Sequence, residues 1–107
     1  AITLRPDVAL AYRFRAYAYL ELGDRVRALN DLDHAIRLKP DDPQAYADRA
    51  AELYAQKAFD LAIADCDRVL KLDPGRAPMY GLRGRAHAER GDTDGALRDY
   101  ATALAND

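Results

Sequence analysis

The sequence has little of several residue types, and each scarcity excludes a class of protein. Its single cysteine, Cys66, excludes an intrachain disulfide framework and assigns no compartment. No apolar run approaches the length of a membrane span, and no charged start with an apolar signal core is present. Charged residues make up 32% of the chain but nearly cancel, to a net charge of -2. We therefore expect neither nucleic-acid binding nor membrane insertion.

Valine and isoleucine are also sparse, and the few prolines and glycines are concentrated in short stretches. Alanine, leucine, arginine and aspartate dominate instead. This composition is typical of helices joined by tight turns, so it predicts an all-α fold.

A period of about 34 residues runs through the chain without a gap. It divides the sequence into units at residues 9–42, 43–76 and 77–107. The side chains that recur at this spacing are Tyr12, Tyr46 and Tyr80; Arg15, Arg49 and Arg83; Ala28, Ala62 and Ala96; and Asp31, Asp65 and Asp99. Because the turn signals recur as well, each unit is predicted to contain two helices and two short turns.

The turn residues place the helix ends. Gly23 and Gly91 stand where a helix end favours a left-handed residue, and Asp42 before Pro43 forms an N-cap followed by a first-turn proline. The middle unit has Lys57 at the glycine place, which predicts the least regular turn. The helices are expected at residues 7–22, 25–38, 43–56, 59–72, 77–90 and 93–106.

These positions together resemble the tetratricopeptide repeat, a helix-turn-helix unit of the same period. The shared features are an aromatic early in the first helix, a small residue four places on, Gly-Asp at the turn, alanine in the second helix and a final proline. In the first unit these are Tyr12, Ala16, Gly23-Asp24, Ala28 and Pro40. The resemblance implies a right-handed α-solenoid of three units and six helices, here forming one domain over residues 1–107.

The start of the chain repeats the end of a unit. Residues 1–6, AITLRP, match AIRLKP at 35–40 and VLKLDP at 69–74. We therefore expect residues 1–8 to be the remnant of a preceding unit, and the chain to be a fragment of a longer array.

The recurring arginines have two competing interpretations. They could form a ladder that clamps acidic or phosphorylated ligands, or each could pair with an aspartate of its own unit. On helical wheels Arg15 and Asp31 lie about 60° to the same side of the facing stripes, at the same level in an antiparallel pair. This geometry favours three structural ion pairs: Arg15 with Asp31, Arg49 with Asp65, and Arg83 with Asp99.

Functional residues of this family lie on the concave surface formed by the first helices, so the resemblance implies a protein or peptide partner there. The side chains expected on that surface as ligand contacts are Arg13, Phe14, Tyr17, Gln44, Asp48, Tyr54, Leu82 and Arg85. Phe14, Tyr17 and Tyr54 are the strongest candidates, because aromatic residues are enriched in binding hot spots. The alternative is that these aromatics pack against a preceding helix or flank their own core.

A narrower subtype of the family grips C-terminal carboxylates of heat-shock chaperones. The subtype uses a basic residue and two asparagines on the first two units, then lysine and arginine on the third. Those places hold Arg13, Tyr17, Asp48, Pro78 and Leu82 here. Only Arg13 matches the subtype among these five places, and Asp48 would repel a carboxylate. The sequence therefore disfavours this clamp.

Catalytic chemistry has little support in the sequence. His34 and His87 lack the spacing to Cys66 or to acids that a metal site or nucleophile relay requires. Cys66 stands at a core place, which predicts a buried, inert thiol. We expect no enzyme activity, cofactor or metal, and a scaffold for protein-protein interaction. The alternatives are a spacer that self-assembles through uncapped ends, and a regulatory arm of a larger enzyme.

Overall fold

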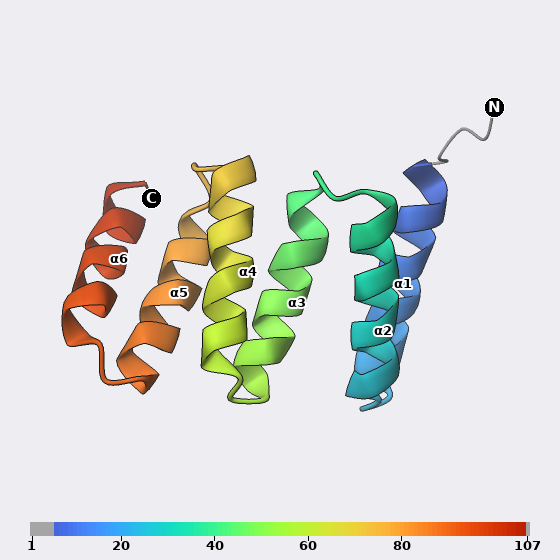
Figure 1. Cartoon of the computed structure of the whole chain (residues 1–107), viewed down its shortest axis with the longest axis horizontal. Helices are drawn as coiled ribbons and strands as arrows, with labels where there is room; N and C mark the ends of the chain where they lie inside the picture. The colour runs from blue at the N-terminus through green and yellow to red at the C-terminus, as the bar shows by residue number, and fades with distance from the viewer. Residues whose placement is uncertain (1–5, 107) are drawn as a thin grey trace.

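The computed structural model describes residues 6–106, with side chains from Val8 onward. These residues form six helices in antiparallel pairs, arranged side by side in chain order (Figure 1). The helices are α1 (Pro6–Glu21), α2 (Arg25–Leu38), α3 (Pro43–Ala55), α4 (Phe59–Leu72), α5 (Ala77–Glu89) and α6 (Thr93–Ala105). The prediction of an all-α fold with six helices is confirmed. Most of the expected remnant of a preceding unit, residues 1–5, lies outside the described residues.

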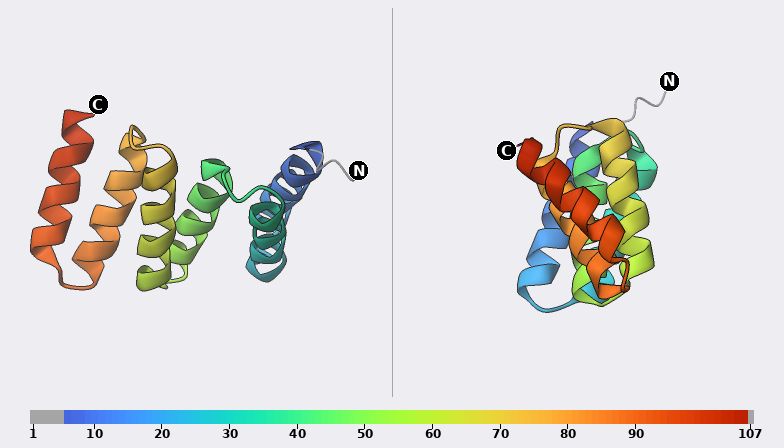
Figure 2. Two further views of the ribbon diagram at one scale, coloured as in Figure 1. Left: turned by 45° about the horizontal axis from the view of Figure 1, so that its top comes forward. Right: turned by 90° about the vertical axis from the view of Figure 1, so that its left-hand side faces the viewer.

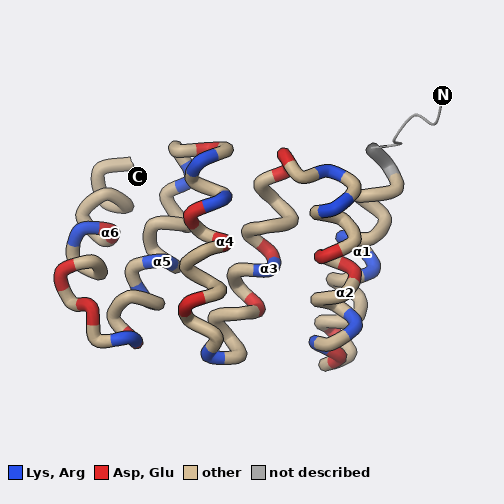
Figure 3. Tube along the Cα trace, viewed as in Figure 1, with Lys and Arg blue, Asp and Glu red and all other residues tan. Residues whose placement is uncertain are grey.

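The helix pairs form an elongated stack. The molecule measures 47 × 30 × 20 Å, and Figure 2 shows that successive pairs are tilted relative to one another. Within residues 6–106, none of the helices combines the length and the hydropathy needed to span a bilayer. Every helix of the described chain carries charges of both signs (Figure 3).

The turns inside the three pairs share one geometry, in which a backbone N–H donates to the carbonyl five residues earlier at 2.8 Å. The residue before each donor is left-handed: Gly23 at φ 78°, Lys57 at φ 65° and Gly91 at φ 82°. The backbone of the middle turn is therefore as regular as that of the other two, but its N-cap, Ala58, makes no side-chain cap hydrogen bond, whereas Asp24 and Asp92 do. Lys57 adopts the conformation of the two glycines because the same hydrogen bonds close its turn.

Small residues let the two helices of a pair approach closely. Ala16 and Ala50 are fully buried, and they occupy the same place in their units as Gly84. A Cβ atom built on Gly84 would lie 2.8 Å from the ring of Tyr100. Tyr100 stands where the first unit has the smaller Leu32, so the missing Cβ makes room for the larger ring.

Neighbouring pairs are joined by an apolar cluster and by tyrosine hydroxyls. Tyr46, Ala47 and Val69 form a buried cluster that also contacts Ile36 of the preceding pair and Met79 of the following one. Ala47, on the first helix of its pair, is therefore a core residue. The hydroxyls of Tyr46 and Tyr80 donate to the carbonyls of Pro40 and Pro74, at 3.2 and 3.1 Å, across the turns between pairs.

Candidate ligand-binding face

The eight residues expected to contact a ligand come from the first helix of each pair, and we call the surface that they form the first-helix face. They are Arg13, Phe14 and Tyr17 on α1, Gln44, Asp48 and Tyr54 on α3, and Leu82 and Arg85 on α5. Phe14 and Arg85 are exposed, and the other six are partly buried. Side-chain contacts join members of the set across neighbouring first helices.

Asp48 is the centre of a hydrogen-bond network that links α1 to α3. The hydroxyl of Tyr17 donates to Asp48 Oδ2 at 2.6 Å, and Gln44 Nε2 donates to Asp48 Oδ1 at 2.9 Å. Arg13 Nη2 donates to the Tyr17 hydroxyl at 3.2 Å, and Arg13 Nε lies 3.7 Å from Asp48 Oδ2. Four of the eight expected residues thus form one connected polar group.

Two residues that the sequence pattern did not place on this face extend the network. Arg13 Nη1 donates to Asp42 Oδ2 at 3.5 Å, and Arg76 Nη1 donates to Gln44 Oε1 at 3.1 Å. The sequence indicates Asp42 only as an N-cap, which it also is, since it accepts from the backbone N–H of Gln44. Residues 42 and 76 occupy equivalent places in their units but carry opposite charges, so the repeat offers no recurring signal for their role.

The network shifts the pKa values of Tyr17 and Arg13, the two members that come from α1. Burial, together with the hydrogen bond donated to Asp48, raises the pKa of Tyr17 above its ordinary value. Burial lowers the pKa of Arg13, but its hydrogen bond with Tyr17 and the charges of Asp42 and Asp48 outweigh that effect and raise it. Tyr17 therefore stays neutral and Arg13 stays cationic at physiological pH.

The aromatic residues of the first-helix face lie in two groups. The rings of Phe14 and Tyr17 are tilted, with centroids 6.1 Å apart. Farther along, the guanidinium carbon of Arg85 lies 4.8 Å from the ring centroid of Tyr54, whose ring also packs edge-on against Phe59. Tyr17 and Tyr54 are thus engaged within the protein, whereas Phe14 is 56% exposed.

The structure brings together each arginine and aspartate that the repeat period paired. The Nε and Nη2 atoms of each arginine donate to both carboxylate oxygens of its aspartate, at 2.7 to 2.9 Å. The arginines also lie beside the tyrosines three residues earlier, 5.5 to 5.8 Å from the ring centroids. The paired residues are Arg15 with Asp31, Arg49 with Asp65, and Arg83 with Asp99.

Two of these arginines also bind the preceding pair. The Nη1 atoms of Arg49 and Arg83 donate to Asp33 and Asp67, each at 2.8 Å. Asp33 and Asp67 recur at the repeat spacing, so the sequence carries a signal for this contact, although the pattern alone indicates only solvated surface and ion pairing. Hydrogen bonds to Asp65 and Asp99 are the main reason that the pKa values of these arginines are raised. Both guanidiniums are therefore committed to carboxylates of the chain.

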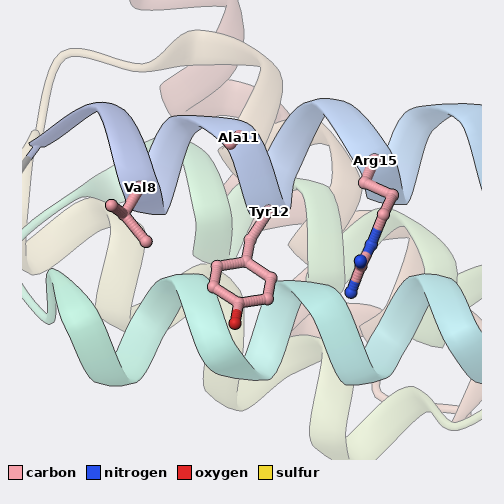
Figure 4. A pocket seen from close by; sticks show the side chains of 4 residues that line it. All are labelled: Val8, Ala11, Tyr12 and Arg15. Atoms are coloured by element: carbon pink, nitrogen blue, oxygen red, sulfur yellow. The ribbon is translucent and has the colours of Figure 1, made fainter.

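A pocket of about 360 Å³ lies beside α1, lined by Val8, Ala11, Tyr12 and Arg15, of which Tyr12 and Arg15 point toward α2 (Figure 4). The equivalent positions in the middle unit include Ala45 and Tyr46, which are both buried, and the cluster of Tyr46 contacts Ile36 of the preceding pair. This pocket therefore marks the end of the stack at which α1 has no preceding helix pair within the described residues.

The residues with catalytic or metal-binding potential are not gathered into a site. Burial raises the pKa of Cys66 to about 12, which leaves its thiol protonated and unreactive at neutral pH. His87 lies near Asp92 and Asp99, with Nδ1 3.4 Å and Nε2 3.7 Å from their carboxylates. Among the described residues, no group of three or more histidines, cysteines or acids could hold a metal ion.

Comparison with known proteins agrees with the repeat fold. The sequence profile described as tetratricopeptide repeat matches residues 9–42, the first unit of the period. The "Protein STIP1 homolog" of Dictyostelium discoideum is 34% identical over 107 residues, which cover 99% of this chain and 18% of that protein. The chain belongs to the tetratricopeptide repeat family. It spans only 14% to 22% of the length of the curated relatives that it matches.

Solved tetratricopeptide repeat structures have the same fold. The "First TPR of Spaghetti (RPAP3) bound to HSP90 peptide SRMEEVD" superimposes with a TM-score of 0.92 at 22% identity, over 100% of this chain and 85% of that one. The "TPR2B-domain:pHsp70-complex of yeast Sti1" gives a TM-score of 0.87 at 27% identity, over 92% of this chain and 79% of that one. The predicted family and solenoid fold are thereby confirmed, and the similarity supports the prediction of an interaction scaffold.

Proposed function

We propose that this tetratricopeptide repeat chain is a non-catalytic scaffold that binds a peptide segment of a partner protein across the first-helix face. The observation that carries the proposal is Phe14, a large aromatic side chain that is 56% exposed beside the ordered network of Arg13, Tyr17 and Asp48. Exposed aromatic anchors on an ordered surface are typical of binding hot spots. Two solved relatives are described as peptide or chaperone complexes, which supports the same class of function.

The hydrogen bonds of the face support binding because they hold it in one arrangement before a ligand arrives. Tyr17 and Asp48 join the first pair to the second, and Gln44 and Arg76 join α3 to the turn that precedes α5. A surface that is already ordered loses less conformational entropy on binding. A peptide lying across the first helices would therefore meet Phe14 and, farther along, Arg85 on a rigid frame.

End-to-end assembly is the second candidate function. It is favoured by an exposed apolar stripe on α6, formed by Leu97, Tyr100 and Leu104. It is disfavoured by Ala101, which stands where the inner pairs have Asp33 and Asp67. If α6 of one copy docked on α1 of another as the inner pairs dock, it would bring no carboxylate to Arg15.

Peptide display tests the proposal with an unidentified partner. Random peptides are selected on the immobilised chain, and the strongest are titrated by calorimetry against Phe14→Ala and a control, Leu61→Ala. Leu61 on α4 is a matched control because it is 60% exposed but lies on a second helix. We expect Phe14→Ala to weaken binding about tenfold or more, as truncation of a hot spot does, and Leu61→Ala to change it less than about twofold.

Either of two results would contradict the proposal. Selected peptides that bind Phe14→Ala normally but lose affinity for Leu61→Ala would move the site to the second helices. Alternatively, if no peptide is recovered and the sedimentation mass rises with concentration, a fall in that mass on Leu104→Ala would favour end-to-end assembly. Leu104 is 77% exposed, so its substitution leaves the core intact.

A further inference from the structure

The guanidinium of Arg13, on the first-helix face, is already paired with two carboxylates of the chain. Arg13 donates to Asp42 at 3.5 Å, and its Nε lies 3.7 Å from Asp48 Oδ2. The side chains of Arg13, Asp42 and Asp48 are all largely buried, at 15% to 18% exposed. A ligand carboxylate that approached Arg13 would therefore have to displace a buried acid or share its guanidinium with two negative charges.

Asp48 is held firmly in this position. Its Oδ2 accepts from the hydroxyl of Tyr17 at 2.6 Å and its Oδ1 from Gln44 at 2.9 Å. Hydrogen bonds to a charged acceptor are stronger than those between neutral groups. Asp48 thus occupies the position next to Arg13 and Tyr17 that an incoming carboxylate would need.

The charge at this part of the face is negative. One guanidinium, that of Arg13, faces the two carboxylates of Asp42 and Asp48, which leaves one uncompensated negative charge. Arg76, which reaches the network through Gln44, is itself paired with Asp73 at 3.0 Å. Arg85 stacks on Tyr54, which is six residues beyond Asp48, about 9 Å along α3. The acidic region therefore lies at Asp42 and in the first half of α3, and Tyr17, which donates to Asp48, connects it to the exposed ring of Phe14.

We infer that the first-helix face selects an internal peptide segment that carries a lysine or arginine next to an apolar side chain, and that Asp48 excludes peptides ending in a free carboxylate. The inference rests on the proposed function and specifies the ligand of the same face. The apolar side chain packs on Phe14, and the cation lies at Asp48 and Asp42. A carboxylate has about four lone-pair positions, and the hydrogen bonds of Asp48 within the protein use two of them, so it can still accept from a ligand.

Two labelled heptapeptides test the inference by fluorescence anisotropy. Both peptides keep the same Arg-Met pair, so they differ only in the charge that follows it. The first is SRMEEVD with a free C-terminus, and the second has lysine in place of each acidic residue and an amidated C-terminus. We expect the wild-type chain to bind the lysine peptide about tenfold or more tightly, because like charges in contact are strongly unfavourable. Asp48→Asn should greatly reduce this preference, because it removes the uncompensated negative charge and leaves one guanidinium facing one carboxylate.

Two further variants separate charge from structural damage. Asp42→Asn removes the other carboxylate while keeping an N-cap residue, so it should shift the preference in the same direction even if Asp48→Asn folds poorly. Arg13→Gln combined with Asp48→Asn should lose the affinity gained for SRMEEVD. Circular dichroism melting of each variant reports whether it is folded.

The outcomes distinguish this inference from the proposed function. If SRMEEVD binds the wild type at least as tightly as the lysine peptide, and Phe14→Ala weakens it, the binding face stands and the inference is overturned. The same conclusion follows if display-selected peptides bind the face but the lysine peptide does not. If the lysine peptide binds Phe14→Ala normally, the proposed face itself is wrong. If Asp48→Asn and Asp42→Asn leave the charge preference unchanged, Asp48 has no role in it.

Discussion

Arg49 binds two carboxylates of unequal burial, so a pair of double-mutant cycles on one guanidinium can test whether the repeated arginines are structural. Its Nε and Nη2 atoms donate to both oxygens of Asp65 at 2.7 and 2.8 Å, and its Nη1 donates to one oxygen of Asp33 at 2.8 Å. The Asp65 side chain is 8% exposed, and that of Asp33 is 42% exposed. The perturbations are Arg49→Met, Asp65→Asn and Asp33→Asn, singly and in pairs.

The expected magnitudes follow from burial and from the number of bonds. Arg49→Met leaves Asp65 buried without its partner, and removing one partner of a buried pair costs about 3 to 5 kcal/mol. Arg49 is itself 26% exposed, so water reaches the site and reduces the expected cost to about 2 to 3 kcal/mol. We expect a coupling energy of about 2 kcal/mol for Arg49 with Asp65. For the exposed, singly bonded Asp33 we expect less than about 1 kcal/mol.

The assay is urea unfolding followed by circular dichroism at neutral pH, with the free energy of unfolding extrapolated to water for each variant. The cycle energies follow from sums and differences of these values. Arg83 with Asp99 and Asp67 has the same arrangement one unit later and should reproduce both couplings. A coupling near zero between Arg49 and Asp65, or one no larger than that with Asp33, would refute the structural interpretation of the arginines.

Three more substitutions test single residues. Lys57→Gly should stabilise the chain by about 0.5 to 1 kcal/mol in urea unfolding, because it relieves the left-handed lysine. Gly91→Ala should lower the free energy of unfolding by about 1 kcal/mol, since no atom lies within 4 Å of the added Cβ and only the backbone is strained. If the two substitutions change stability in the same direction, this account is wrong. The pKa of Cys66 is raised to about 12, so the folded state retains the thiol proton that the unfolded state loses from about pH 8.5. The free energy of unfolding should therefore fall above that pH, with a slope of up to about 1.4 kcal/mol per pH unit, and Cys66→Ala should reduce that slope. If the wild type and Cys66→Ala give parallel curves of unfolding free energy against pH, the buried thiol is not responsible.

The contacts inside each helix pair could be predicted from the sequence because helical periodicity determines which side chains face each other. Arg15 and Asp31 lie at matching levels on two antiparallel helices, and the same relation recurs in both later units. The left-handed turn at Lys57 could not be predicted in the same way. Its conformation is imposed by hydrogen bonds that close the helix end, whereas the residue itself carries no preference for it.

The surroundings of the candidate site were predictable only in part. Arg13, Tyr17 and Asp48 could be assigned to the first-helix face from helical geometry. Their bonds to one another, and the participation of Asp42 and Arg76, could not be derived from it. These contacts join different helix pairs, and they depend on tilts between the pairs that no local pattern encodes.

The sequence by itself determined the helices, their pairing, the repeat family and the arginine-aspartate pairs inside each unit, because all of these follow from the period of the helix and the period of the repeat. Only the tertiary structure decided that the acids near Arg13 reach its guanidinium and that Phe14 stays exposed beside them. The physical reason is the short range of the hydrogen bonds. Hydrogen bonds act over about 3 Å, so a small change in the tilt between neighbouring pairs decides whether they form.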